Sequence, residues 1–243
     1  YNVTNDISQS LHNNKKLSAA LRIAKRRMAL WVALCDLGGL WTLEKVMQSL
    51  TDFAEIALKH SLAYAFRYQV EKARPKGFVL EEDLNKAGIF VLAMGKMGAG
   101  ELNYSSDIDL ICLFDDSRFG PLDFDEARRI FIKTTRKMAS MLNDITSDGY
   151  VFRTDLRLRP DPSVTPVCIG TEAAERYYES LGRTWERAAY IKARVAAGDF
   201  SAGSDFLSRI QPFVWRKHLD FAAIEDAHNM RLAIRGHRGF AGT

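Results

Sequence analysis

Two short apolar runs, separated by a glycine-rich loop, constrain the fold of this chain more than any other feature. The first run, residues 89–93, has no polar side chain, which is typical of a strand buried on both faces. The loop at residues 95–100 contains three glycines. The second run, residues 107–114, begins at an Asp-Ile-Asp sequence and continues apolar. We expect two strands of one small sheet, with the loop at their shared end.

The regions before and after these runs have the period of helices. Apolar residues recur three and four positions apart over residues 17–34 and 43–70, and again over 123–145 between the second run and a turn at Asp148-Gly149. Thr171 is a candidate N-cap for a helix that ends at Gly182, and two more helices are expected near 203–216 and 221–235. The expected fold class is α+β and mostly helical.

The change of period along the chain predicts three regions. Residues 1–85 form an N-terminal helical region, 86–162 a mixed-sheet core, and 163–243 a C-terminal helical region. A third strand is expected at 150–158, before Pro160 and Pro162. The glycine-rich end at 239–243 closes no expected element, so we expect the sequence to be a fragment of a longer chain.

The second strand presents a pair of carboxylates. Side chains alternate along a strand, so Asp107 and Asp109 point the same way while Ile108 and Leu110 point towards a core. Two carboxylates that lie close together resist ionising together, and a divalent cation removes that difficulty. Magnesium prefers a few carboxylates together with water and substrate phosphates. A metal site is therefore predicted here, although a solvated strand face is the commoner explanation of an isolated pair.

The expected third strand repeats this pattern. On it, Asp155 shares a face with three arginines, and it can complete a cluster of three carboxylates if this strand lies beside the second. Such clusters suit phosphoryl or nucleotidyl transfer. We expect Arg157 and Arg159 to hold phosphate, because guanidinium groups bond phosphate oxygens in pairs. A solvated sheet edge is the alternative for this arginine face.

The glycine-rich loop supplies phosphate-binding candidates. Gly95 allows backbone N–H groups to approach a phosphate closely, and Lys96 offers a cation. Ser106 is a further candidate, although Ser105 and Ser106 are also typical of residues that shape a turn. The loop matches neither G-x-x-x-x-G-K-[ST] nor G-x-G-x-x-G, so neither a P-loop nor a dinucleotide fingerprint is present.

Composition excludes several other classes. The net charge of +4 is spread along the chain, so no nucleic acid is expected as a partner. No segment is apolar for long enough to span a bilayer, so no membrane is expected either. Three widely spaced cysteines fit a reducing cytoplasm, and neither they nor the five histidines have the spacing of zinc ligands.

Three motifs, in order, resemble one family. Residues 95–110, 152–160 and 185–194 are similar to the nucleotidyltransferase signature, the third-carboxylate strand and a further segment of glutamine synthetase adenylyltransferase. The resemblance implies a polymerase-beta-like nucleotidyltransferase core with Asp107, Asp109 and Asp155 as metal ligands and catalytic residues, and Mg²⁺ (or Mn²⁺) as the cofactor.

The resemblance also implies a substrate. Enzymes of this family contain two related halves, one that attaches AMP to a tyrosine of glutamine synthetase and one that removes it by phosphorolysis, releasing ADP. Residues 36–39 and 185–194 look more like the amino-terminal, adenylyl-removing half. Nucleotide and phosphate would bind at the site, and the PII signal protein would regulate the full-length enzyme. The alternatives are adenylylation by ATP and a regulatory module without catalysis.

Overall fold

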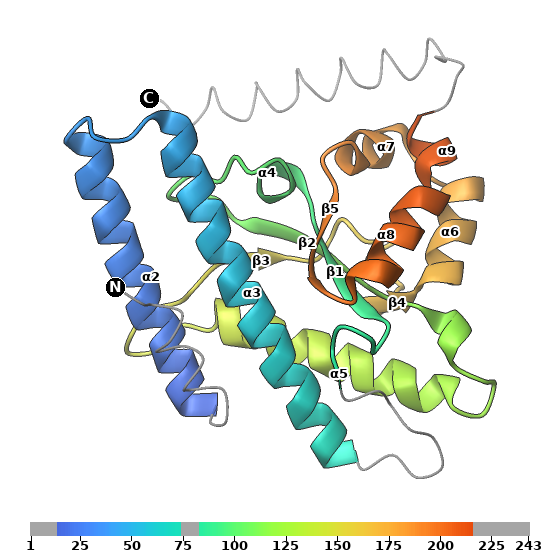
Figure 1. Ribbon diagram of the computed structural model, residues 1–243. Coiled ribbons are helices and arrows are strands. Elements are labelled where there is room, and N and C mark those ends of the chain that lie inside the picture. The colour runs from blue at the N-terminus through green and yellow to red at the C-terminus, as the bar shows by residue number, and fades with distance from the viewer. Residues whose placement is uncertain (1–13, 74–82, 216–243) are drawn as a thin grey trace.

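A mixed five-stranded sheet lies at the centre of the structure, a computed structural model that describes residues 14–73 and 83–215 (Figure 1). Its strands are β1 (Ile89–Ala93), β2 (Ile108–Phe114), β3 (Thr154–Asp155), β4 (Cys168–Gly170) and β5 (Arg194–Gly198). Strand β1 pairs antiparallel with both β2 and β5. On its other edge, β2 pairs in parallel with β3 at its beginning and with β4 at its end. The expected α+β fold with a mixed sheet is confirmed.

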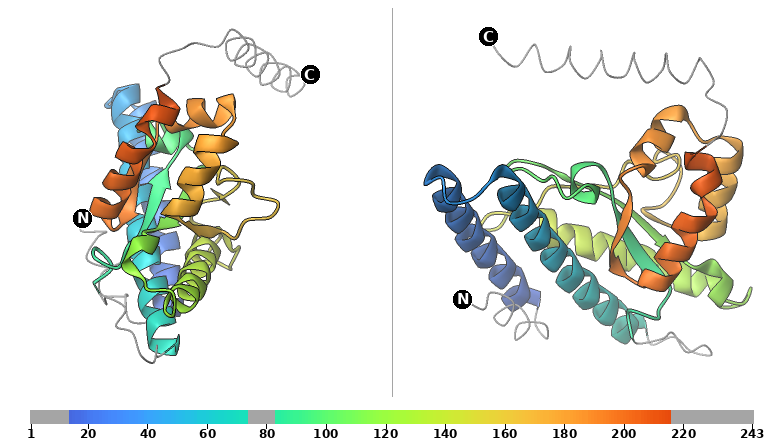
Figure 2. Two further views of the ribbon diagram at one scale, coloured as in Figure 1. Left: turned by 90° about the vertical axis from the view of Figure 1, so that its right-hand side faces the viewer. Right: turned by 45° about the horizontal axis from the view of Figure 1, so that its top comes forward.

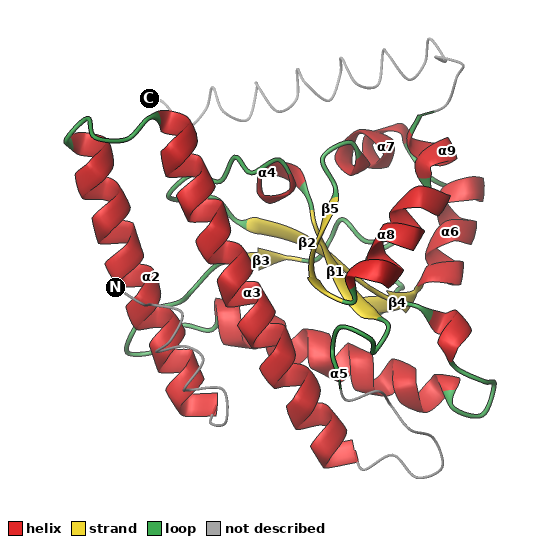
Figure 3. Cartoon of the chain, in the orientation of Figure 1, coloured by secondary structure: helices red, strands yellow, loops and turns green. Residues whose placement is uncertain are grey.

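Helices surround this sheet in two groups (Figure 3). The helices of the first group are α2 (Asn14–Leu37), α3 (Leu43–Ala73) and α5 (Phe124–Asn143). The helices of the second group are α6 (Thr171–Ser180), α7 (Thr184–Tyr190), α8 (Phe200–Arg209) and α9 (Gln211–Val214). Two short elements, α4 (Gly95–Gly98) and the 3₁₀ helix η1 (Asp116–Arg118), follow β1 and β2. Among the described residues, no helix is long and apolar enough to cross a membrane.

The continuous apolar run of β1 is explained by a separate core on each face of the sheet. Ile89, Val91 and Ala93 pack into the core that α2, α3 and α5 share. Phe90 and Leu92 face the other core, among residues of α6, α8 and α9. Figure 2 shows the strands between the α2–α3 pair and the group from α6 to α9. A strand buried on both faces needs no polar side chain.

The C-terminal part of the sequence differs most from expectation. The predicted strand at 150–158 is reduced to β3, because residues 156–160 turn away from β2 immediately after Asp155. The region at 163–243, expected to be helical, supplies β4 and β5 to the sheet. The expected boundary at residue 162 therefore falls in the turn between β3 and β4, two strands of the same sheet.

The helices of this region also differ in detail from the prediction. Thr171 is the first residue of α6 rather than its N-cap, and its hydroxyl donates to Asp116. The helix expected at 203–216 begins earlier, at Phe200, because the side chain of Asp199 accepts from the backbone N–H of Ala202 and caps it. It divides into α8 and α9 at Ile210. The predicted helix at 221–235 lies outside the described residues.

A buried arginine fixes α2 to the end of α5. The Arg22 side chain is 1% exposed, and its guanidinium donates to the carbonyl oxygens of Gly149 (2.6 Å) and Asp144 (2.5 Å). It also donates to the carbonyl of Met141 and to the carbonyl and hydroxyl of Ser18. Most of these acceptors belong to the end of α5 and the turn after it, where carbonyls have no partner within the helix. Arg22 therefore positions the segment that leads into β3.

Replacing Arg22 with methionine should lower the free energy of unfolding by about 2–4 kcal/mol, since hydrogen bonds to a charged group are lost and buried carbonyls are left without a donor. Urea denaturation followed by circular dichroism measures this change.

Arg26, one helical turn further along α2, provides the matched control. Its ion pair with Asp148 spans 3.1 Å between side chains that are 59% and 37% exposed. Because exposed pairs contribute about 0–1 kcal/mol, Arg26→Met should change stability little. Equal losses for the two variants would show that the buried bonds of Arg22 do not hold the turn.

Candidate active site at the beginning of strand β2

The two aspartates of the Asp-Ile-Asp sequence lie where β2 begins. Asp107 is exposed and directly precedes the strand, and Asp109 is its second residue and half-buried. Between and after them, Ile108 and Leu110 are fully buried in the core shared with α2, α3 and α5. The alternation predicted from the sequence is therefore present, and its apolar half anchors the strand that carries the carboxylates.

Asp155 lies beside this pair. Strand β3 runs parallel to β2, with Asp109 in register with Asp155 and Ile108 in register with Thr154. The backbone N–H of Ile108 donates to the carbonyl of Arg153 over 2.9 Å, which fixes this register. Residues in register on adjacent strands point to the same face of a sheet. The two-residue length of β3 is thus enough to bring the third aspartate to the first two.

The three carboxylates influence one another electrostatically. Burial raises the pKa of Asp109, and the negative charges of Asp155 and Asp107 raise it further, while Arg157 and Lys96 oppose the shift. Hydrogen bonds from Arg157 lower the pKa of Asp155 despite its partial burial. Neighbouring carboxyl groups with pKa values shifted in opposite directions are typical of functional sites. An added positive charge at this place would favour the ionised form of Asp109.

Two arginines bond the outer carboxylates. Arg153 forms an ion pair with Asp107 and donates to the carbonyl of Ser105 over 2.8 Å. Arg157 donates through Nε and Nη2 to both carboxylate oxygens of Asp155, at 2.5–3.0 Å. The Arg157 side chain is 83% exposed, and ion pairs of this kind contribute about 0–1 kcal/mol. Both arginines can therefore exchange a carboxylate for another anion at small cost.

Arg159 and Ser106 have structural partners instead. Arg159 is 9% exposed, and its guanidinium donates to the backbone carbonyls of Leu156 (2.7 Å), Pro162 (2.9 Å) and Thr165 (3.1 Å). These bonds occupy its guanidinium, while its charge still lowers the pKa of Asp155, and the phosphate-binding role of Arg159 stays a prediction. The hydroxyl of Ser106 donates to Asn103 Oδ1 over 2.7 Å and shapes the turn before Asp107.

The glycine-rich loop forms the single turn α4 directly beside Asp109. The backbone N–H of Met94 donates to the carbonyl of Asp109 over 2.9 Å. Gly95 has a positive φ of 52°, and a Cβ there would lie 2.9 Å from Asp109 Oδ2, so any other residue would strain the backbone and displace this carboxylate. A Cβ at Gly98 would lie 2.0 Å from the carbonyl oxygen of Lys192. The Lys96 side chain is exposed on the same turn.

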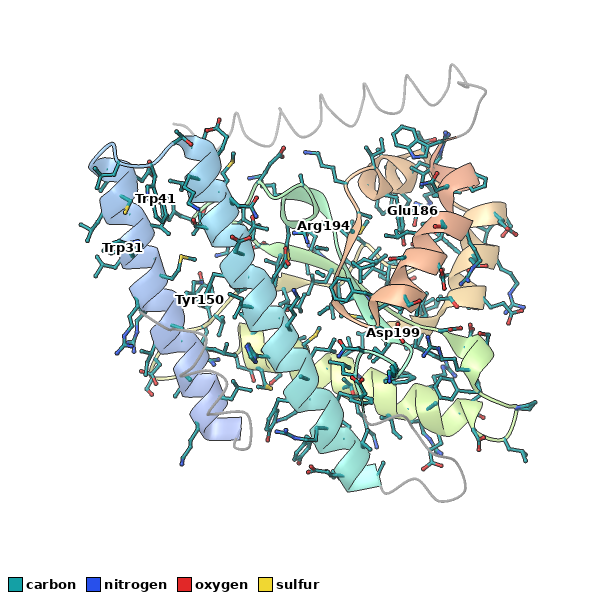
Figure 4. All side chains as sticks on the ribbon, in the orientation of Figure 1. Trp31, Trp41, Tyr150, Glu186, Arg194 and Asp199 are labelled. Carbon is teal, nitrogen blue, oxygen red and sulfur yellow. The ribbon has the colours of Figure 1, made fainter. Side chains whose placement is uncertain are left out.

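Residues from distant parts of the chain hold this loop in place. Arg194, labelled beside α4 in Figure 4, donates to the carbonyls of Gly98 and Met97 at 3.0 Å and forms an ion pair with Glu55 of α3. Lys192 forms an ion pair with Glu101 over 2.9 Å. Sequence reasoning placed Lys192 and Arg194 in a motif but did not identify this bracing role. The role could not be predicted because it depends on strand β5, whose pairing with β1 carries Arg194 to the loop.

The donor set fits a hard divalent cation. Asp107, Asp109 and Asp155 supply only carboxylate oxygens, which magnesium and manganese accept. Within the described residues, no three His, Cys, Asp or Glu side chains lie as close together as the ligands of a metal ion. In this structure, Asp107 and Asp155 bond to Arg153 and Arg157 instead. A metal site here stays a prediction, and these three residues are its candidates.

Asp109→Asn should stabilise the protein at pH 7 in the presence of EDTA. A carboxyl group whose pKa is raised by folding stabilises the fold only at acid pH, and that stability is lost as the pH rises through the folded pKa. Asparagine removes the unfavourable ionised form, so thermal unfolding at pH 7 should occur at a higher temperature than in the wild type. The difference should shrink towards pH about 4, near the unfolded pKa. A variant less stable than the wild type at pH 7 would contradict this reading of Asp109.

Comparison with known proteins identifies the family. The sequence model of the glutamate-ammonia ligase adenylyltransferase family matches residues 2–209. A bifunctional glutamine synthetase adenylyltransferase/adenylyl-removing enzyme from Bradyrhizobium sp. is 50% identical over 219 residues, which is 90% of this chain and 22% of that protein.

Proteins with the same description show similar values. Identity is 52% over 221 residues for the protein from Bradyrhizobium diazoefficiens and 46% over 227 residues for the one from Rhizobium meliloti. The chain covers 90% and 92% of its own length in these two comparisons, and 22% and 23% of the relatives. It thus spans about a fifth of the length of the relatives that it matches. This chain belongs to the glutamate-ammonia ligase adenylyltransferase family.

Proposed function

We propose that this chain is a nucleotidyltransferase unit that acts on the AMP–tyrosine bond of glutamine synthetase. The observation that carries the proposal is the register of Asp109 with Asp155 directly beside the glycine turn α4. The exposed side chain of Lys96 lies on this turn. Arg153 and Arg157 form ion pairs with Asp107 and Asp155, which are themselves exposed or partly exposed. The substrate is proposed from the names of the relatives, which describe glutamine synthetase adenylyltransferase and adenylyl-removing enzymes.

Asp107, Asp109 and Asp155 would hold Mg²⁺, with Mn²⁺ as the alternative. The raised pKa of Asp109, shifted by burial and by its neighbours' charges, supports a cation at this place. When bound, the metal would neutralise charge that develops on the transferred phosphoryl group. Glycine at position 95 leaves space beside the Asp109 carboxylate, and the buried residues Ile108 and Leu110 anchor the strand in the core.

The cationic side chains around the carboxylates would hold the phosphates. Arg153 and Arg157 would exchange Asp107 and Asp155 for phosphate oxygens, which guanidinium groups bond in pairs. Lys96 would supply a further charge from α4. Arg194 would act as a positioning residue, since it fixes the carbonyls of Met97 and Gly98 at the end of this turn.

The proposed direction is adenylyl removal. An oxygen of inorganic phosphate would attack the adenylyl phosphorus, the bond from that phosphorus to the tyrosine oxygen would break, and the tyrosine oxygen would take up a proton. The products are ADP and unmodified tyrosine. The similarity of residues 36–39 and 185–194 to the removing half supports this direction. Adenylylation by ATP is the second candidate, because the names of the relatives include both activities.

The proposed setting is the bacterial cytoplasm, with the PII signal protein as a regulator of the full-length enzyme. The three cysteines, Cys35, Cys112 and Cys168, are all buried and free, as is usual in a reducing compartment.

The direct test incubates the protein with adenylylated glutamine synthetase, inorganic phosphate and Mg²⁺, and measures ADP. ADP should form only when phosphate is present, and Asp109→Asn or Asp155→Asn should reduce its rate by at least about a hundredfold, since even residues that only support metal ligands change activity by 10–100-fold. Circular dichroism checks that both variants fold.

Two further arms separate the alternatives. Labelled ATP with unmodified glutamine synthetase detects adenylylation, and incorporation of AMP without any ADP release in the first assay would reverse the proposed direction. Arg26→Met, which changes an exposed arginine of α2, serves as the matched control and should keep wild-type activity. Turnover that survives both aspartate substitutions would refute the carboxylate mechanism.

A further inference from the structure

A second group of cations lies between α3 and α5. A pocket of 390 Å³ is lined by Gln69, Lys72 and Ala73 of α3 and by Glu126, Arg129, Ile130 and Lys133 of α5. Lys137 continues the stripe of α5, because residues 129, 133 and 137 follow at intervals of four and share one helix face. We call the pocket with these seven lining residues the α3–α5 pocket. Volumes of this order hold small organic ligands.

Two tyrosine rings of α3 contact cations of this group. The Lys137 Nζ lies 5.1 Å from the ring centroid of Tyr68 and 5.8 Å from that of Tyr64. The Lys72 Nζ lies 5.9 Å from the ring centroid of Tyr68. Lys72 of α3 and Lys137 of α5 therefore both contact the Tyr68 ring, although each carries the same charge.

The described residues that line this pocket carry more positive than negative charge. Glu126 is the one carboxylate among the lining residues, against the cations Lys72, Arg129 and Lys133. In the part of the chain that the structure describes, none of these three cations, nor Lys137, forms an ion pair with a carboxylate. Like charges four residues apart on a helix repel each other, so positions 129, 133 and 137 destabilise α5 locally. Such a local conflict is expected where a ligand relieves it.

The α3–α5 pocket is distinct from the aspartate site. Thr51 of α3 contacts the loop after α4, since its hydroxyl accepts from the backbone N–H of Leu102. Lys72 follows 21 residues later on the same helix, and a rise of 1.5 Å per residue separates the two positions by roughly 30 Å. Figure 1 shows this end of α3 passing α5 at the bottom of the molecule, away from α4.

We propose that the α3–α5 pocket binds a small molecule that bears two or more phosphate groups. A phosphate ester carries about 1.5–2 negative charges, so a compact polyphosphate matches several converging cations better than carboxylates with one charge each. Arg129 can bond phosphate oxygens in pairs, and Lys72, Lys133 and Lys137 supply point charges. This inference does not depend on the reaction at the aspartates.

Inorganic tripolyphosphate is the probe, titrated by calorimetry into the protein with EDTA present so that no divalent metal contributes. Lys133→Glu on α5 and Lys72→Glu on α3 should each weaken binding at least tenfold. Arg128→Glu is the matched control, because it makes the same change of charge one position away from Arg129, at a side chain that lines a different pocket with Asp116 and Glu172. Arg128→Glu should bind within threefold of the wild type, and circular dichroism confirms that all variants fold.

Three results would overturn the proposal. Equal affinity in the wild type, Lys133→Glu and Lys72→Glu would place the probe elsewhere, and no detectable heat at millimolar tripolyphosphate would show that the pocket is an ordinary solvated surface. Citrate, which carries three carboxylates, tests the ligand class. Citrate that binds as tightly as tripolyphosphate would refute the assignment to phosphates.

Discussion

The parallel pairing of β2 with β3 places the carboxylates of Asp109 and Asp155 side by side, and the surrounding structure holds them there against their mutual repulsion. Asp109 and Asp155 are in register, and Asp107 stands two residues before Asp109. Repulsion of this kind would separate two free segments, but each strand is anchored independently. Buried side chains hold β2 from beneath, and the hydrogen bonds of Arg22 hold the turn that leads into β3.

The same constraint explains the arrangement of cations. Arg153 and Arg157 are exposed, so water screens their bonds to Asp107 and Asp155 and leaves them exchangeable. Arg22 and Arg159 bond to backbone carbonyls within the protein, where a bond is difficult to replace. Exposure and the type of acceptor therefore distinguish the arginines with exchangeable carboxylate bonds, Arg153 and Arg157, from those that hold the fold, Arg22 and Arg159.

The sequence predicted the elements with local signals and missed those that depend on distant partners. The apolar run of β1 and the helix face of α5 are written into consecutive residues, and both are confirmed. Strands β4 and β5 are short, and their pairing with β2 and β1 is decided by residues far away in the chain. For the same reason, simple alternation placed Arg159 beside Asp155, whereas the turn after β3 buries it. The grouping of the three aspartates could be predicted, because the polar and apolar side chains alternate within each of the two sequence segments that contain them.

The bracing of the glycine turn by Arg194 has a consequence for how the chain folds as it is synthesised. Helix α4 and β2 leave the ribosome about ninety residues before β5, whose pairing with β1 carries Arg194 to Met97 and Gly98. Until β5 arrives, one edge of β1 has no partner, and pairings between residues so far apart in sequence form slowly. The glycine turn α4 should therefore be among the last parts of the domain to become ordered, so a nascent chain would acquire the arrangement of the candidate site only when the sheet is complete.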